Sequence, residues 1–241
     1  MQGNVKRRRW DGKERRMHIE PGLVDGAKIV LSYVTAAGAG AYALQRAWVA
    51  LREQGAASFS GRAIASTALV FSFFEILPHF PVGVSEVHLI LGSTLFLIFG
   101  VAPAAFGLAL GLLLQGLLFA PFDLPQYGMN VTTLLVPLFV LEALARRIIP
   151  SDMAYVDLGY GQVLSLSLAY QGGIVAWVAF WALYGQGVTA SNLAAISTFG
   201  GAYLLVVLIE PMVDLLVLAS AKGIRGLKGS GWVTPRLHSA A

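Results

Sequence analysis

The chain has 241 residues, of which 56% are hydrophobic and only 12% are charged. Soluble domains carry about a quarter charged residues, so this composition excludes an ordinary soluble enzyme and predicts an all-α, polytopic membrane helix bundle. The formal net charge is +4, and the absence of cysteine excludes disulfides and thiolate metal ligands.

The positive charge is concentrated at the N-terminus. Seven basic and two acidic residues precede Met17, whereas ten basic and eleven acidic residues follow it. This distribution argues against nucleic acid as a partner. The partner that we expect for so apolar a chain is membrane lipid. Residues 1–16 contain no apolar region typical of a signal peptide. We expect them to be a surface-binding tail or an upstream segment that the working protein lacks.

Apolar runs after this leader predict about seven transmembrane helices in one domain, 17–222, followed by a cytoplasmic tail, 223–241. The first run contains "TAAGAGAYA", a small-residue composition that suits close approach between helices. The second and third runs are short and flank the segment "LPHFPVGVSEVH". The seven runs lie near 27–51, 62–78, 86–101, 103–121, 129–149, 162–184 and 193–220.

Lysine and arginine alternate between the connections of these runs. Arg52 and Arg62 flank the first connection, Arg146 and Arg147 begin the fifth, and further basic residues lie in the C-terminal tail. The connections near 79–86, 122–128 and 185–192 have none. The positive-inside rule then places the C-terminus inside and the N-terminus outside. A leader of net +5 outside would break that rule, which favours Met17 as the first residue of the functional chain.

Three of the four histidines, His18, His79 and His88, fall at the outer ends of the predicted bundle, and His238 lies in the tail. A chain beginning at Met17 offers a planar chelate made of the terminal amine, the His18 amide nitrogen and the His18 imidazole. A second imidazole completes a square of four nitrogens, which favours Ni(II), Cu(II) or tetragonal Co(II). Without a free amine on Met17, His18 is an ordinary imidazole at a helix entrance. His79 is either an entry-side metal contact or an interfacial residue.

Acidic residues also occur within or beside the runs. A buried charge in a bilayer is costly, so each is a functional candidate or forms a structural hydrogen bond between helices. Glu86 precedes His88 by two residues and can attract a cation or orient a ligand. The other acids considered are Glu75, Asp123, Glu142, Glu210 and Asp214.

Several function classes are excluded or left open by motifs. No Walker motif and no His-Glu-x-x-His helix is present, so we expect a transport component and not an enzyme. The last run has no lysine for a retinal Schiff base. An unrelated small-molecule or proton-coupled membrane carrier that uses intramembrane glutamate and histidine remains the alternative.

Four segments resemble the CbiM/NikM family, the substrate-binding components of energy-coupling factor (ECF) importers for cobalt and nickel. "MHIEPG" resembles the start of its members, and "FPVGVSEVHLILGSTLFLIFGVAPAAF" resembles the family's Gly-His-Leu-Leu-Gly-Gly stretch and the span after it. "QGLLFAPFDLPQYGMNVTTLLVP" is similar to its Gln-x-Leu-Leu-Phe-Ala run and downstream Gly-x-Asn. "LLVVLIEPMVDLLV" is like its acidic last helix.

The resemblance implies a multi-pass protein of the cell inner membrane that captures Co²⁺ or Ni²⁺ as transported ligand, with no cofactor of its own. Met17 and His18 would supply three nitrogens and His88 the fourth, with Asn130 orienting a ligand. An ECF transmembrane coupling protein and ATP-binding subunits would drive uptake. The chain departs from the family pattern at positions 20 and 21 and at Val87.

Overall fold

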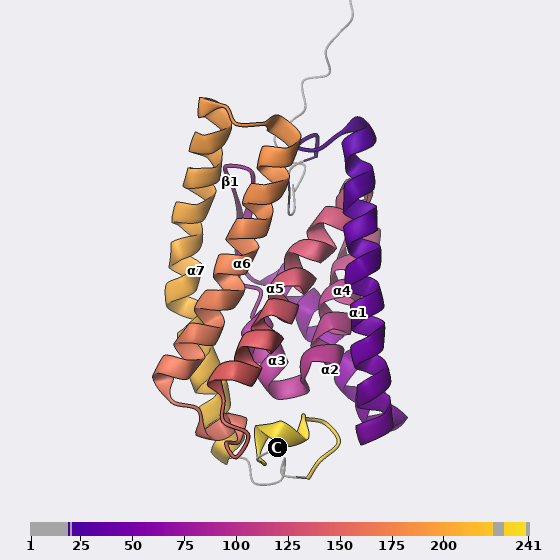
Figure 1. Ribbon diagram of the computed structural model, residues 1–241, viewed down its shortest axis with the longest axis vertical. Helices are drawn as coiled ribbons and strands as arrows, with labels where there is room; N and C mark the ends of the chain where they lie inside the picture. Colours follow the sequence, from indigo (N-terminus) through magenta and orange to yellow (C-terminus); the bar gives the residue numbers. More distant parts are fainter. Residues whose placement is uncertain (1–18, 20, 224–228, 240–241) are drawn as a thin grey trace, which may run out of the picture.

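A computed structural model describes residue 19, residues 21–223 and residues 229–239 of the chain, apart from the side chains of 221 and 222. It confirms the expected all-α bundle, which contains one two-stranded hairpin (Figure 1). The seven α-helices of the described residues are α1 (Val30–Gln54), α2 (Ala56–Ile76), α3 (Gly92–Phe99), α4 (Val101–Leu118), α5 (Tyr127–Ile148), α6 (Tyr160–Gln186) and α7 (Ala190–Gly223). Strands β1 (His79–Val82) and β2 (Ser85–His88) pair antiparallel, and short 3₁₀ turns lie at η1 (Gly26–Ile29), η2 (Pro121–Gln126), η3 (Tyr155–Asp157) and η5 (Pro235–Leu237).

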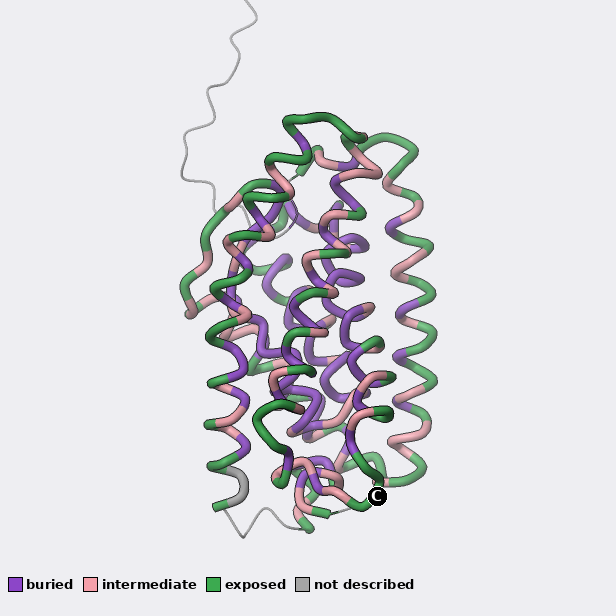
Figure 2. The backbone as a smooth tube through the Cα atoms, turned by 60° about the vertical axis from the view of Figure 1, so that its left-hand side comes forward, coloured by how far each residue is buried: buried purple, intermediate pink, exposed green. Residues whose placement is uncertain are grey.

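Among the described residues, six helices are long and apolar enough to cross a membrane. The remaining one, α3, has eight residues. Large apolar side chains are exposed on the outer helices, as on α1 and α7, where lipid can cover them. Buried residues concentrate in the middle of the bundle (Figure 2).

The expectation of a continuous helix over 86–101 is wrong. Sixteen residues of helix reach only about 24 Å, which is short of the roughly 30 Å bilayer core. Here β2 and a short link precede α3, which completes the passage. Residues 85–90 as extended chain, at up to about 3.3 Å each, plus eight residues of helix at 1.5 Å, reach about 32 Å.

This third passage runs alongside α7 over most of its length. Gly83 packs against the backbone of Ala195, and Ile90 bonds to Glu210 further along α7. The Ile98 carbonyl accepts a hydrogen bond from the Thr234 amide near the C-terminus. The start of α1 and the C-terminal residues lie at opposite ends of the bundle, as seven passages require (Figure 1).

Close helix approach occurs at glycines outside the first run. A Cβ built on Gly107 of α4 would lie 1.9 Å from Ser66 Oγ of α2, and one on Gly111 would lie 2.6 Å from Val70. In contrast, Gly38 and Gly40 of α1 have nothing within 4 Å of such a Cβ. In the "TAAGAGAYA" stretch the small residues that face inward are therefore the alanines Ala39 and Ala43, followed by Ala47 one turn later, and not the glycines.

Candidate metal centre

The hairpin carries two of the candidate residues to the interior of the bundle. Residues at alternate positions of a strand point to one face, so Glu86 and His88 of β2 share a face. Both are buried, whereas His79, the cross-strand partner of His88, is half-buried. Gly83 lies in the turn at φ +66°, and a Cβ there would be 2.2 Å from the Ala195 carbonyl oxygen of α7. Only glycine allows the turn to adopt this conformation this close to α7.

Two carboxylates of α7 hold the chain directly after His88. Glu210 Oε1 accepts hydrogen bonds from the Ile90 amide at 2.8 Å and the Leu91 amide at 2.9 Å. These amides belong to the N-terminal end of α3, where backbone donors have no helical partner and negative charge is favourable. Gln171 of α6 donates to the other oxygen of Glu210.

One turn further along α7, Asp214 accepts hydrogen bonds from the hydroxyls of Ser93, at 2.7 Å, and Thr94. Glu210 and Asp214 are four residues apart on one helix face, so both meet the same passing segment. Leu91 lies in the left-handed region at φ +57°, an uncommon conformation for leucine. The carboxylates of α7 thus fix the position of β2 and of His88 along the bundle.

The N-terminal described residues are fixed by the end of α6. Gln186 donates to the carbonyls of Gly22, at 3.1 Å, and Leu23, at 2.9 Å. Lys28 Nζ donates to the carbonyls of Tyr184 and Gly185, where the C-terminal end of a helix attracts a cation. Gly185 allows this packing, because a Cβ there would lie 1.9 Å from the Leu23 oxygen.

These anchors place Ile19 in the wall of a small cavity of about 20 Å³. Ile19 is 1% exposed, and its amide donates to Asn130 Oδ1 of α5 at 3.2 Å. Glu86, His88 and Asn130 line the same cavity, together with apolar residues of α5, α6 and α7. The His88 ring meets the Phe74 ring of α2 edge-on, with centroids 4.9 Å apart.

The structure therefore brings together His88, Glu86 and Asn130, three of the five residues that the sequence assigned to a metal site. The other two, Met17 and His18, lie outside the described residues. Within the described part of the chain, no group of three or more His, Asp or Glu side chains can hold a metal ion.

The remaining candidates lie elsewhere. Asp123 is buried beside a second small cavity that Asn130 also borders. Glu142 lies at the opposite end of the bundle, where it pairs with Arg46 and Arg146. His79 Nδ1 lies 3.3 Å from the Leu77 carbonyl, and His238 is half-buried in the tail.

Sequence reasoning missed the partners of the α7 acids, Gln171, Ser93 and Thr94, as well as the role of Ile19. A signal for the first three existed, because polar side chains inside apolar runs need partners. No sequence pattern connects Ile19 with Asn130, which are 111 residues apart.

The helix bundle and its internal, donor-lined cavity define the class as a polytopic membrane protein that encloses a small polar site. The family model described as "Cobalt uptake substrate-specific transmembrane region", CbiM, matches residues 18–226. The chain belongs to this family and is a membrane component of transition-metal uptake.

Solved structures show the same fold. A crystal structure of a truncated transition metal transporter matches with a TM-score of 0.64 and 21% identity, covering 86% of this chain and 99% of the other. A second transition metal transporter structure matches with a TM-score of 0.64 and 20% identity, covering 86% and 93%. No curated protein matches the chain at a significant level.

Proposed function

We propose that this chain is the substrate-binding component of an ECF-type importer and captures Co²⁺ or Ni²⁺ at its extracytoplasmic face. The ligands are the Met17 amine, the His18 amide nitrogen and imidazole, and the His88 imidazole. Asn130 and Glu86 orient the ligands and attract the cation. Partner ATP-binding subunits and a transmembrane coupling protein supply the energy, since the chain has no phosphate-binding motif of its own.

One observation carries this proposal: the buried Ile19 lines the same cavity as His88, Glu86 and Asn130, and its amide donates to Asn130. Consecutive Cα atoms are about 3.8 Å apart, and His18 directly precedes Ile19, so the chain connectivity keeps His18 close to that cavity. The hydrogen bond that the amide of Ile19, the residue after His18, donates to Asn130 Oδ1 would hold the N-terminal chelate in register with His88.

The proposal includes Met17 as the first residue of the functional chain and residues 1–16 as a dispensable leader. Three observations support it: the charge conflict of the leader with the positive-inside rule, the start of the family match at His18, and the burial of Ile19. A terminal amine is a metal ligand only if no residue precedes Met17.

The proton-coupled carrier remains the weaker alternative. Such a carrier needs membrane-embedded acids that are free to exchange protons. Here Glu210 and Asp214 accept hydrogen bonds from backbone amides and from hydroxyl and amide side chains, which gives them a structural role.

His88→Ala tests the proposal. We expect it to abolish Ni²⁺ and Co²⁺ binding, because the fourth nitrogen is lost. The matched controls are His79→Ala, its cross-strand partner, and His238→Ala in the tail, and both should bind as the parent does. Metal content after metal-free purification and reloading checks this. Retention of metal by His88→Ala would refute the assignment.

A further inference from the structure

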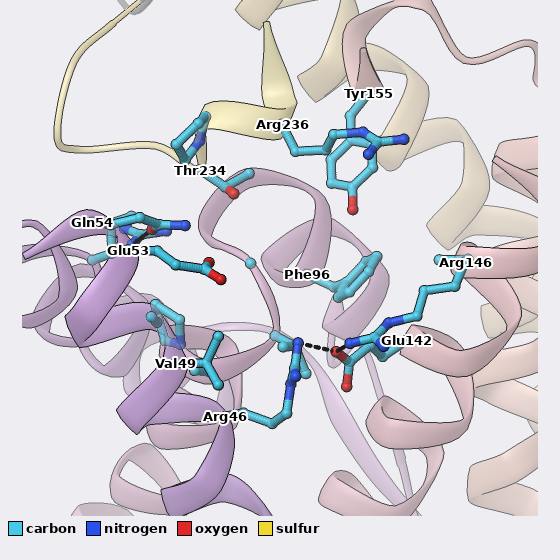
Figure 3. A pocket seen from close by; sticks show the side chains of 18 of the residues that line it. Arg46, Val49, Glu53, Gln54, Phe96, Glu142, Arg146, Tyr155, Thr234 and Arg236 are labelled. Carbon is cyan, nitrogen blue, oxygen red and sulfur yellow. Dashed lines mark hydrogen bonds and ion pairs between the residues drawn. The ribbon is translucent and has the colours of Figure 1, made fainter. Parts of the chain in front are cut away.

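A third cavity, of about 550 Å³, lies at the end of the bundle opposite the His88 cavity. It is lined by the C-terminal ends of α1 and α5, the N-terminal parts of α2 and α4, one residue of α3, the connection between α5 and α6, and the C-terminal segment Thr234–Arg236. Charged and polar side chains line it together with apolar ones (Figure 3). Nothing in metal capture at the other end uses this space.

The cavity has an excess of positive charge. Arg46, Arg62, Arg146 and Arg236 line it, against two carboxylates, Glu53 and Glu142. Arg46 Nη2 and Arg146 Nη2 both reach the same oxygen of Glu142, at 2.6 and 2.7 Å, from α1 and α5 (Figure 3). One carboxylate oxygen thus serves two guanidinium groups, and the charge of the pair is incompletely balanced.

The other two arginines bond to neutral groups. Arg62 is buried and donates to the carbonyls of Ser58 and Phe99 and to the Gln54 side chain. Arg236 donates to the carbonyls of Met153 and Pro150. Such bonds satisfy donors without cancelling charge, so the cavity attracts an anion and repels a divalent cation.

Donor groups remain for such an anion. Arg46 Nε is buried and has no hydrogen-bond partner among the described residues. The Arg146 side chain is 61% exposed, so a ligand can reach it from outside the bundle. Burial raises the pKa of the Tyr155 hydroxyl, a rise that the Arg236 guanidinium opposes, and the protonated hydroxyl can donate as well.

Exposed tryptophan residues lie beside the cavity, on α1 and on the C-terminal segment. Trp48, which precedes the lining residues Val49 and Ala50 on α1, is 57% exposed and has the Arg52 guanidinium 4.5 Å over its ring. Trp232 of the C-terminal segment is also exposed and packs against Gly61 at the start of α2. Tryptophan and arginine in this arrangement are typical of the membrane interface.

We propose that this cavity binds the phosphate group of an anionic phospholipid, held between Arg46 of α1 and Arg146 of α5. Basic pockets between transmembrane helices are a known recognition mode for anionic headgroups. Under the proposed orientation the cavity faces the cytoplasmic leaflet, where such lipids are plentiful. A bound phosphate would join α1, α5 and the C-terminal segment at this end of the bundle.

The test compares phosphatidylglycerol with phosphatidylcholine of the same acyl chains, bound to the full chain in detergent and measured by native mass spectrometry. We expect selective retention of phosphatidylglycerol, weakened about fivefold by Arg146→Gln because about 1 kcal/mol is lost per basic residue. Arg147→Gln is the matched control, an exposed neighbour that does not line the cavity. The basic residues before Met17 are present in every variant, so their contribution cancels.

Glu142→Gln gives a result that misfolding cannot imitate. It frees Arg46 and Arg146 from their shared carboxylate, so binding of the anion should become tighter. A parallel titration with inorganic phosphate identifies the source: binding of both ligands supports recognition of the phosphate group itself, and binding of the lipid alone supports a headgroup site. Equal retention of the two lipids, equal loss in Arg147→Gln, or weaker binding in Glu142→Gln would overturn the proposal.

Discussion

The turn of the hairpin depends on a single glycine. Gly83→Ala puts a Cβ 2.2 Å from a backbone oxygen of α7 and in a left-handed conformation, which costs an L-residue about 1–2 kcal/mol even in open space. We expect Gly83→Ala to lower both the thermal stability and the metal affinity, because the hairpin that carries His88 must move away from α7.

Gly187→Ala separates the two causes. Gly187 has a similar φ, +72°, but a Cβ there meets nothing within 4 Å. Gly187→Ala should lose only the stability that the backbone strain costs and should keep the metal affinity of the parent. If both variants lost stability and affinity equally, the contact between the hairpin turn and α7 would not position His88.

Individual residues show where sequence reasoning reached the candidate site and where it stopped. The i, i+2 spacing of Glu86 and His88 places them on one face of an extended strand, and this spacing can be read from the sequence. Asn130 came from a resemblance, and its bond to Ile19 was not predictable, because only the fold brings α5 against the N-terminal segment. On α1 the small-residue composition indicated close packing without saying which residues face inward, and the buried ones are the alanines at every fourth position, Ala39, Ala43 and Ala47.

The third passage combines a strand, a link and a short helix, and it needs external partners for its backbone. Unpaired amides inside a membrane cost several kcal/mol, so only a protein-lined site tolerates them. Here β1 pairs with β2, and Glu210 accepts hydrogen bonds from the Ile90 and Leu91 amides that follow β2. The apolar pattern of 86–101 alone could not reveal this, because a short apolar run fits a strand or a buried helix equally well.

Glu210→Ala tests this dependence. It leaves the Ile90 and Leu91 amides without their acceptor, at a cost of about 1–3 kcal/mol for each buried group. We expect lower metal affinity at temperatures well below unfolding, with faster hydrogen exchange at these two amides. Glu210→Gln keeps an acceptor oxygen and should restore part of the affinity.

Glu53→Ala is the control for that experiment, since Glu53 is an exposed acid at the opposite end of the bundle. It should leave metal affinity unchanged. Unaltered affinity in Glu210→Ala would show that α7 stabilises the fold without positioning His88.

The molecule as a whole follows its apolar pattern closely. Six of the seven predicted passages are helices, and the two ends of the described chain lie on opposite sides of the bundle. Long runs fix helices well because a spanning segment must satisfy its own backbone. The small polar cavity and the basic cavity were not visible in the sequence, since each collects residues from elements far apart in the chain.

The orientation in the membrane is testable with single cysteines, because the native chain has none. Val188, 79% exposed between α6 and α7, should react after substitution by cysteine with an impermeant reagent added from outside. Ser151, in the connection between α5 and α6, should react only from the cytoplasmic side. Labelling of position 188 from the cytoplasmic side alone would contradict the proposed orientation and indicate the opposite one.

The central claim, that the N-terminal amine of Met17 is a metal ligand beside His88, is tested most directly by titrating Ni²⁺ and Co²⁺ into two purified chains, one starting at Met17 and one at Met1. The short chain should bind more tightly, with an affinity that rises as pH increases through the amine pKa of about 7.7–8.0 and with release of protons on binding. An alanine inserted between Met17 and His18 should abolish binding by the short chain, because it moves the imidazole out of the chelate. Equal affinity of the long and short chains would contradict the account and leave the ligands to side chains alone.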